Sequence, residues 1–579
     1  MDYTQQYKIW TEKADKAYLK ELKALSGDDK ELKERFSMPL AFGTAGMRGV
    51  LGMGIGNMNV YTVARATKGL AEYIKSEEAQ KRGVIISYDT RRMSYEFALV
   101  TARVLAAQGV TAYLFEDVRP VPMCSFAVRH LGCKAGVMIT ASHNPKEYNG
   151  YKVYGEDGAQ MSPEATAKVV KYIDESDYFD IPMADVVTDE RDIIKGKDNY
   201  CLSDNITVIG SSVDNRYFDE VAKLSLSQDE VAAVGKDIKI VYSPLHGSGY
   251  MPVTTMLKRM GISADIVEEQ RLPDPDFPTV TVPNPEQSEA LALGIALANK
   301  TGSDLVIGTD PDCDRMGIAV RDDQGQFVTL TGNQIGCLLM DYVLSRRADL
   351  GAMPDNAAVV KTIVTTRLAN RIADAYGAKV YDVLTGFKFI GEKIKQWEEN
   401  QHRTFMFGFE ESYGYLCGTH ARDKDAVVAS MLIAELACYC LAHGVTLYDR
   451  LRGIWAKYGY FCETSKSLVF KGLDGMERMS SIMEKLRACP PKSLGGKSVS
   501  AVSDYLSSVT EYSDGKQQLI NLPKANVLKY ELGDDMWACV RPSGTEPKLR
   551  IYVSTAGGDK VKTEELNKLI QSELSACAD

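Results

Sequence analysis

Apolar and polar positions repeat along the chain as a unit that occurs three times. Each unit begins with a short apolar run, at residues 84–88, 238–242 and 357–360. Each run is followed by a helix-like stretch that ends at a glycine, at Gly109, Gly261 and near Gly377, and then by a second apolar run. Such short runs have the length of buried strands, and glycine commonly ends a helix. The order predicts βαβ units of mixed, mainly parallel sheets.

The pattern changes after about residue 450. Three strand-like runs follow one another closely, at 527–531, 537–540 and 549–553, with helix-like stretches at 476–488 and 560–573. Closely spaced strands with tight turns predict an antiparallel sheet, and therefore a separate α+β domain. A chain of 579 residues is also longer than a single hydrophobic core normally supports. We expect three related α/β domains at 1–205, 206–325 and 326–450, and an α+β domain at 451–579.

Composition restricts the partners of the chain. Its apolar fraction of 45% and charged fraction of 25% are ordinary for a globular protein. The net charge of −10 argues against a nucleic-acid binder, whose binding domain would be basic. Local clusters of Arg and Lys can still bind a small anion in an acidic protein. We therefore expect no nucleic-acid partner, and a small anionic substrate remains compatible with the composition.

The sequence carries no signal typical of export or of a membrane span. The first 35 residues are rich in charge and predict amphipathic helix, and the longest apolar helix candidate, 426–441, is interrupted by Glu435. The twelve cysteines are scattered without a CxxC pair, which favours reduced thiols in the cytoplasm. Cys417 with His420 and Cys440 with His443 have a zinc-like spacing. A structural zinc site needs four ligands, and the second pair lies at the end of the apolar helix candidate 426–441, which we interpret as a buried core helix. Zinc is therefore disfavoured.

A polar loop follows the apolar run at 136–140. It contains Ser142, His143 and Asn144, and Pro145 prevents a regular continuation. Lys152 follows on a second short strand after an Asn-Gly turn signal. A hydroxyl beside cations and amides suits phosphate, whose charge they neutralise. The alternative is a polar turn that only links two strands.

An acidic loop follows the apolar run at 305–308. Asp310, Asp312 and Asp314 alternate there, so their carboxylates can converge on one hard cation. An EF-hand is excluded because Arg315 and Arg321 occupy the positions that require Gly and Glu. The alternative is a solvated acidic turn.

Four further loops carry charged or polar groups that could bind a ligand. The loop at 42–49 holds Arg48 between glycines, and the loop at 385–389 holds Lys388. Carboxylates and a hydroxyl at 408–414 suit sugar hydroxyls, and cations follow at Arg422 and Lys424. For Arg422, a solvated charge on a surface turn is an equally good interpretation. The loop at 541–548 combines an arginine, hydroxyls and a glycine, and it predicts a phosphate cradle in place of an ordinary hairpin turn.

These motifs together resemble the α-D-phosphohexomutase superfamily. They are Thr-Ala-Ser-His-Asn-Pro at 140–145, Asp-Pro-Asp-Cys-Asp-Arg at 310–315, Gly-Phe-Glu-Glu-Ser at 408–412 and Arg-Pro-Ser-Gly-Thr-Glu-Pro at 541–547. They occur in the superfamily's order and cover essentially the whole length. With the loops at 42–48 and 385–389, the chain is similar to the branch that includes bacterial phosphoglucomutases and phosphopentomutases.

The resemblance implies four domains around a central cleft, and it implies a role for each matching residue. Ser142 would carry a phosphate and, with Asp310, Asp312 and Asp314, would hold Mg²⁺, with Arg315 beside the metal. The residues beside the transferring phosphoryl group would be Arg48, His143 and Lys152. The residues that bind the sugar hydroxyls and the stationary phosphate would be Glu410, Ser412, Arg541, Ser543, Gly544 and Thr545, with Lys388 and Lys424 as further substrate contacts.

The implied reaction interconverts glucose 1-phosphate and glucose 6-phosphate through a glucose 1,6-bisphosphate intermediate, in a monomeric or homodimeric enzyme. Lys152 or His143 would take the proton of the attacking hydroxyl. Cys313 stands where many relatives carry a small residue, and we expect its soft sulfur to point away from the metal. The alternatives are a phosphopentomutase, a phosphomannomutase, or a sugar-phosphate sensor without turnover. The intact serine and aspartates argue against the sensor.

Overall fold

The computed structural model describes residues 2–44, 46–470, 475–533, 535–543 and 548–577. The chain divides into two compact units. The first comprises Met1–Leu330, Ile390–Gln401 and Tyr413–Gly444, and the second Thr331–Phe389, His402–Ser412 and Val445–Asp579. Each unit is described by itself.

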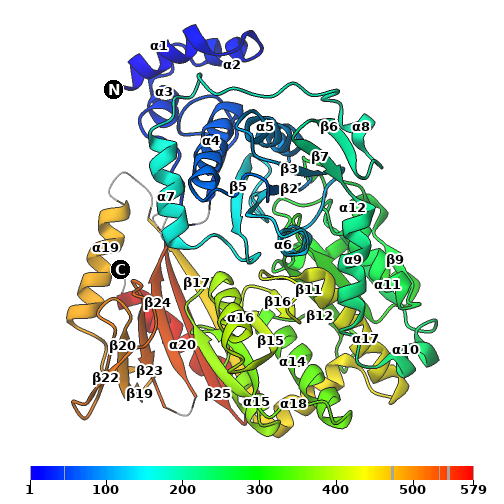
Figure 1. Ribbon diagram of the computed structural model, residues 1–579. Helices are drawn as coiled ribbons and strands as arrows, with labels where there is room; N and C mark the ends of the chain where they lie inside the picture. The colour runs from blue at the N-terminus through cyan, green and yellow to red at the C-terminus, as the bar shows by residue number, and fades with distance from the viewer. Residues whose placement is uncertain (1, 45, 471–474, 534, 544–547, 578–579) are drawn as a thin grey trace. The chain divides into compact units, whose positions relative to one another are not determined.

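The first unit contains a seven-stranded sheet in the order β1-β5-β4-β2-β3-β7-β6. Figure 1 labels β5, β2, β3, β7 and β6 of this sheet. Its strands are β1 (Gly46–Val50), β2 (Val84–Tyr88), β3 (Ala112–Phe115), β4 (Ala135–Ile139), β5 (Tyr148–Gly155), β6 (Tyr200–Ser203) and β7 (Ile206–Ile209). The central strands β4, β2, β3 and β7 are parallel, whereas β1, β5 and β6 pair antiparallel. Every residue of β2 and β4 is buried, as expected for central parallel strands. The predicted mixed sheet is confirmed.

Helices α5 (Ser94–Ala107) and α6 (Val121–His130) pack against this sheet. Helix α4 (Val60–Ser76) packs against α5 and against α7 (Pro163–Asp174). Three N-terminal helices, α1 (Tyr3–Lys13), α2 (Leu19–Ala24) and α3 (Asp29–Phe36), bury Trp10 among aromatic rings that include Tyr61 and Phe179. The amphipathic start of the chain is thus part of the unit's packed structure.

A second sheet of the first unit has the order β12-β11-β10-β8-β9. Its strands are β8 (Ile240–Ser243), β9 (Ala264–Ile266), β10 (Leu305–Thr309), β11 (Met316–Arg321) and β12 (Phe327–Thr329). Strand β10 is parallel to β8 and antiparallel to β11. The acidic loop is therefore the connection between the two neighbouring strands β10 and β11, and their ladder fixes both of its ends.

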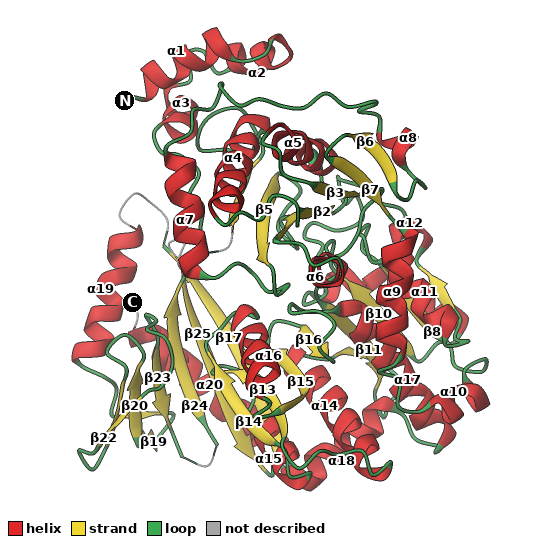
Figure 2. Ribbon diagram, in the orientation of Figure 1, coloured by secondary structure: helices red, strands yellow, loops and turns green. Residues whose placement is uncertain are grey.

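The second unit combines an α/β part and an antiparallel part. In the α/β part, β13 (Ala357–Thr362) lies parallel to β14 (Lys379–Val383) and β15 (Thr404–Glu410), with helices α14 (Gly332–Asp349), α15 (Leu368–Ala375) and α18 (Leu447–Tyr458). The antiparallel sheet has the order β17-β25-β24-β23-β20-β21-β22. Figure 2 shows these strands in yellow.

The strands of the antiparallel sheet are β17 (Tyr460–Val469), β20 (Ala501–Asp504), β21 (Val509–Tyr512), β22 (Gln517–Leu519), β23 (Leu528–Glu531), β24 (Trp537–Pro542) and β25 (Lys548–Gly557). Helices α19 (Gly475–Ala488) and α20 (Lys560–Cys577) accompany them. Trp537 and Tyr552 of this sheet form an apolar cluster with Ile363 and Leu384 of the α/β part. The predicted C-terminal α+β domain is confirmed.

Within the described residues, no single helix has the length and apolar character needed to cross a membrane, whereas one bent pair, α17 (Ala426–Ala442) with α18, satisfies both criteria when taken together.

Candidate active site

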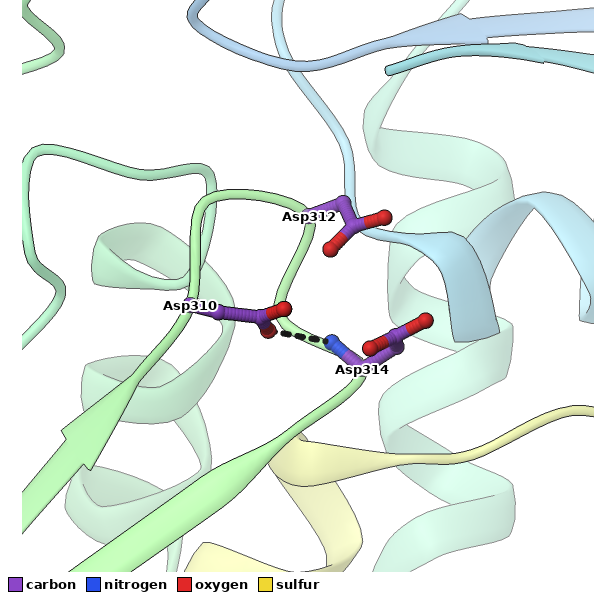
Figure 3. A group of neighbouring side chains, drawn as sticks. All are labelled: Asp310, Asp312 and Asp314. Carbon is purple, nitrogen blue, oxygen red and sulfur yellow. Dashed lines mark hydrogen bonds between the residues drawn. The ribbon is translucent and has the colours of Figure 1, made fainter. Parts of the chain in front are cut away.

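The acidic loop between β10 and β11 brings three buried carboxyl groups together. One oxygen from each of Asp310, Asp312 and Asp314 lies within 4.8 Å of the others, and Figure 3 shows the carboxyl groups converging. Asp310 Oδ1 accepts hydrogen bonds from the backbone N–H groups of Asp314 at 3.1 Å and Arg315 at 2.9 Å, which fold the loop around it. Among the described residues this is the one such group of His, Cys, Asp or Glu, so the zinc alternative finds no support there.

The donor set fits a hard cation. Asp312 Oδ1 and Asp314 Oδ1 are buried and have no hydrogen-bond partner within the described chain. Burying a carboxylate oxygen without a partner is costly, and oxygen ligands are what Mg²⁺ and Ca²⁺ prefer. Cys313 is not in this group, and its Sγ faces Gly249, as expected for a sulfur that does not bind the metal. The solvated-turn alternative is wrong, because all three aspartates are buried.

Burial and neighbouring charges act differently on the aspartates. Burial, reinforced by the charges of Asp312 and Asp314, raises the pKa of Asp310 well above its ordinary value. Burial also acts to raise the pKa of Asp314, but the ammonium groups of Lys424 and Lys152 outweigh it and hold that pKa below the ordinary value. A cation bound among these carboxyl groups would oppose their mutual repulsion and favour the charged form of Asp310.

Ser142 lies directly beside this cluster. It follows β4 with a φ of 53°, and its Oγ donates a hydrogen bond to Asp310 Oδ2 at 2.9 Å. The same Oγ is 3.1 Å from His143 Nδ1. Burial and the charge of Arg315 hold the pKa of His143 well below its usual range, so the imidazole is neutral at pH 7. The structure thus joins the predicted nucleophile to the predicted metal loop.

Three cations flank the same cluster. Lys152, on β5 and opposite Met138 of β4, places its Nζ 2.8 Å from Asp312 Oδ2. The Nζ of Lys424 is 3.2 Å from Asp314 Oδ2. Burial acts to lower the pKa of Lys152, but the charges of Asp312 and Asp314 raise it above its ordinary value, so this lysine stays charged. Arg315 Nε is 3.8 Å from Asp314 Oδ1, and this arginine also forms an ion pair with Glu286 at 2.5 Å.

Arg48 reaches the serine loop from β1. The register of β1 with β5 pairs Gly46 with Lys152, which brings both basic residues to neighbouring strands. Arg48 Nη1 donates to Asn144 Oδ1 at 3.1 Å. The first unit therefore assembles Arg48, the serine loop, Lys152 and the acidic loop in one place.

The loop before α17 (Ala426–Ala442) decides between the two interpretations of Arg422. Arg422 is not a solvated surface charge: its side chain is fully buried, donates to the carbonyl oxygens of Thr419 and Ala421, and pairs with Glu398. These hydrogen bonds and the ion pair stabilise the loop that continues to Lys424. Lys424 lies at the acidic loop, where it contacts Asp314, and its contact with substrate remains a prediction.

The remaining predicted residues lie in the second unit. Glu410 ends β15 and is buried, Ser412 follows it, and Lys388 begins α16 (Lys388–Asn400). Arg541 of β24 donates a hydrogen bond to Thr385 Oγ1, so the predicted phosphate loop contacts the loop that leads to Lys388. Their roles remain predictions.

Ser543 and Lys548 are the described residues on either side of the central part of the predicted phosphate loop. The backbone N–H of Ser543 donates to the carbonyl oxygen of Lys548 at 2.7 Å. Gly544 and Thr545 lie outside the described residues.

Sequence reasoning missed several residues that support this site. Asp423 binds Lys424 and accepts from Tyr154 and Gln160, and Glu286 pairs with Arg315. Arg91 donates to the backbone of the serine loop. Asp423 adjoins Lys424 in sequence, which was an available signal, but the other two lie 29 and 51 residues from their partners, and only the folded chain brings them near.

A serine bound to a buried carboxylate cluster, on three α/β domains and an antiparallel C-terminal domain, defines the class of phosphohexomutases. Four domain models match the chain in order: "Phosphoglucomutase/phosphomannomutase, alpha/beta/alpha domain I" at 39–179, domain II at 215–325, domain III at 331–458, and the C-terminal domain at 499–568. The chain belongs to the phosphoglucomutase/phosphomannomutase family.

Individual relatives agree with this assignment. Phosphoglucomutase of Staphylococcus aureus (strain USA300) is 38% identical over 554 residues, which cover 95% of this chain and 96% of the relative. A putative phosphomannomutase from Thermus thermophilus has a TM-score of 0.66 at 21% identity, covering 93% of this chain and 99% of that one. The open form of parafusin, a phosphoglucomutase from Paramecium, gives 0.67 at 16% identity, with 93% of each chain covered. At these identities the two structures support the fold alone.

Proposed function

We propose that this enzyme interconverts glucose 1-phosphate and glucose 6-phosphate, with Ser142 as the residue that carries the phosphoryl group. The observation that carries the proposal is the 2.9 Å hydrogen bond from Ser142 Oγ to Asp310, which places a hydroxyl at a buried three-carboxylate cluster. The S. aureus relatives named phosphoglucomutase support the glucose assignment. The alternative function, a sugar-phosphate sensor without turnover, would not need a hydroxyl held at this cluster.

The chain's own groups account for the transfer of the phosphoryl group. Phosphoryl transfer depends mainly on positioning and on neutralising the charge of the equatorial oxygens. Lys152, Arg48 and Lys424 supply positive charge around Ser142, and His143 supplies a hydrogen-bonding group beside Oγ. His143, which is neutral, would take the proton from the attacking sugar hydroxyl, whereas Lys152 stays charged and cannot accept it.

The metal in this proposal is Mg²⁺, held by Asp310, Asp312, Asp314 and an oxygen on Ser142. When bound, it supplies positive charge that polarises the phosphoryl oxygens. The buried oxygens of Asp312 and Asp314 that accept no hydrogen bond within the described residues are the atoms that would bind it.

Transfer of the phosphoryl group from Ser142 to the free hydroxyl of glucose 1-phosphate or glucose 6-phosphate gives glucose 1,6-bisphosphate and leaves the serine hydroxyl free. The bisphosphate then turns and returns its other phosphate to the serine. The site must therefore accept a second phosphate and the sugar hydroxyls. We assign the phosphate to Arg541, Ser543, Gly544 and Thr545, and the sugar to Glu410 and Ser412, with Lys388 as a further contact. The protein would work in the cytoplasm as a monomer or homodimer.

A substrate panel tests the proposal. Purified protein, with Mg²⁺, is assayed against glucose, mannose and ribose 1-phosphates, each with a trace of the matching bisphosphate. We expect the highest kcat/KM with glucose 1-phosphate and dependence on glucose 1,6-bisphosphate. A higher value with mannose or ribose would reassign the substrate to a phosphomannomutase or phosphopentomutase reaction. Sugar-phosphate binding without turnover would support the sensor instead.

A further inference from the structure

A buried ion pair lies behind the loop that carries Ser142. Asp89 and Arg91 follow β2, their side chains are fully buried, and Arg91 Nε is 3.4 Å from Asp89 Oδ2. Because β2 is parallel to β4, the carboxyl ends of both strands meet at one edge of the sheet, where β4 leads into the serine loop. The pair and the loop are thus brought together by the sheet's topology.

Arg91 binds the serine loop through four backbone carbonyl groups. Its Nη2 donates to the oxygens of Ser142 at 2.6 Å and Asn144 at 2.5 Å, and its Nη1 to those of Pro145 at 2.8 Å and Tyr148 at 3.0 Å. A planar guanidinium can hold several acceptors in a fixed geometry, which the single ammonium of lysine cannot reproduce. One side chain therefore sets the path of the whole loop.

Asp89 holds the other side of Ser142 through a threonine. The backbone N–H of Ser142 donates to Thr140 Oγ1 at 2.8 Å, and that hydroxyl donates to Asp89 Oδ2 at 2.6 Å. The N–H and the C=O of Ser142 are consequently both tied to the same ion pair. Ser142 has a left-handed φ of 53°, which a residue other than glycine keeps only when its surroundings enforce it.

We propose that Arg91 is a positioning residue of the mutase reaction, acting with Asp89 and Thr140. It does not touch the reacting group. It holds the backbone of Ser142 in the left-handed conformation that directs Oγ to Asp310. This inference rests on the proposed function, in which Ser142 carries the phosphoryl group. Transfer is sensitive to small displacements of the reacting atom, so a loosened loop should slow the chemical step more than substrate binding.

Two variants test the inference. Thr140→Val keeps the side chain's shape but removes both hydrogen bonds, and Arg91→Lys keeps the charge but loses the planar fork. We expect kcat to fall roughly 10- to 100-fold in each, with the KM for glucose 1-phosphate within about twofold of wild type, because the sugar contacts are untouched. The ³¹P resonance of the phosphoserine should shift or broaden in both.

A matched control is Arg65→Lys. Arg65 is also a largely buried arginine that donates to a backbone carbonyl, that of Ser176 at 3.0 Å, but it does not bind the serine loop. Its variant should keep the wild-type kcat. An equal fall in this control, or folded Thr140→Val with kcat within twofold of wild type, would overturn the inference. If Arg91→Lys does not fold, Thr140→Val decides alone.

Failure of the proposed function has a different signature. It would appear as missing mutase activity in the wild-type protein. The crystal structure of Thr140→Val then still decides the positioning claim without an activity measurement. A changed φ at Ser142 with Oγ moved away from Asp310 supports the claim, and an unmoved Ser142 contradicts it.

Discussion

At the scale of single residues, the contacts of Asp310, Asp312 and Asp314 show why three aspartates occur together in the acidic loop. Asp310 uses one oxygen to fold its own loop and the other to accept from Ser142. Asp312 and Asp314 each leave one buried oxygen without a hydrogen bond within the described residues. Such atoms are rarely tolerated unless a ligand completes them. The alternation of aspartates predicted the cluster from sequence, because alternate residues of a tight loop can face one point.

Removing one ligand charge tests the metal site. Asp312→Asn should weaken Mg²⁺ binding, measured by calorimetry, by about tenfold or more, because an amide oxygen is a poorer ligand for a hard cation. Turnover should fall in parallel and recover in part at high Mg²⁺. Asp304→Asn is the control, since its side chain is 78% exposed just before β10. Full activity of chelated wild-type enzyme would show that the acidic loop needs no metal.

At the scale of elements, the pattern of apolar residues predicted the strands, because that pattern depends only on neighbouring positions in the sequence. The runs at 84–88 and 357–360 became β2 and β13, and the acidic loop follows a buried strand, as expected. Patterning did not predict the burial of Arg422, because that depends on Glu398, 24 residues earlier, and on backbone carbonyls that only the fold supplies. The same limit applies to Arg91. Charged residues that fold around distant partners give no local periodicity.

Strand β17 contains a carboxyl group whose titration should affect stability. Burial raises the pKa of Glu463 from its ordinary 4.5 to about 7, against hydrogen bonds from Thr366 and Ser554 that lower it. Between about pH 4.5 and pH 7 the folded protein keeps a proton on Glu463 that the unfolded chain releases. The contribution of protonated Glu463 to the free energy of unfolding is therefore fully present below about pH 4.5 and is lost as the pH rises through about 7.

Glu463→Gln keeps a neutral side chain at every pH. Relative to wild type, it should gain stability between pH 5 and pH 8, by at most about 3 kcal/mol. Thermal unfolding at several pH values measures the difference. Glu565→Gln, at an exposed position of α20, should show no such trend. A constant difference between Glu463→Gln and wild type across this range would mean that Glu463 ionises normally.

At the scale of the whole molecule, the predicted residues divide between two units. The serine and acidic loops lie in the first, whereas Glu410 and Arg541 lie in the second. The sequence motifs predicted the four domains of the family, and the fold confirms their α/β and antiparallel character. The borders at 205, 325 and 450 remain predictions, as do the roles of Lys388, Glu410, Ser412, Arg541 and Ser543. Sequence spacing cannot show which distant loops share one ligand.

Arg541→Ala tests the assignment of the stationary phosphate. Loss of a charge-assisted hydrogen bond should raise the KM for glucose 1-phosphate by about 10- to 100-fold. Hydrolysis of the phosphoserine by water should stay near the wild-type rate, because Ser142 lies in the other unit. Arg478→Ala, on the exposed face of α19, is the control. An unchanged KM in Arg541→Ala would assign its loop to an ordinary hairpin.

The central claim is that Ser142 carries the phosphoryl group. Peptide mass spectrometry before and after a single turnover with stoichiometric glucose 1-phosphate whose phosphate carries ¹⁸O, in wild type and Ser142→Ala, tests it most directly. We expect unlabelled phosphate on Ser142 in the resting enzyme and ¹⁸O-labelled phosphate on Ser142 after the turnover, because the bisphosphate returns its other phosphate to the serine. We also expect that Ser142→Ala folds normally but turns over several orders of magnitude more slowly. Phosphate on another residue, or near-normal mutase activity in Ser142→Ala, would contradict the account.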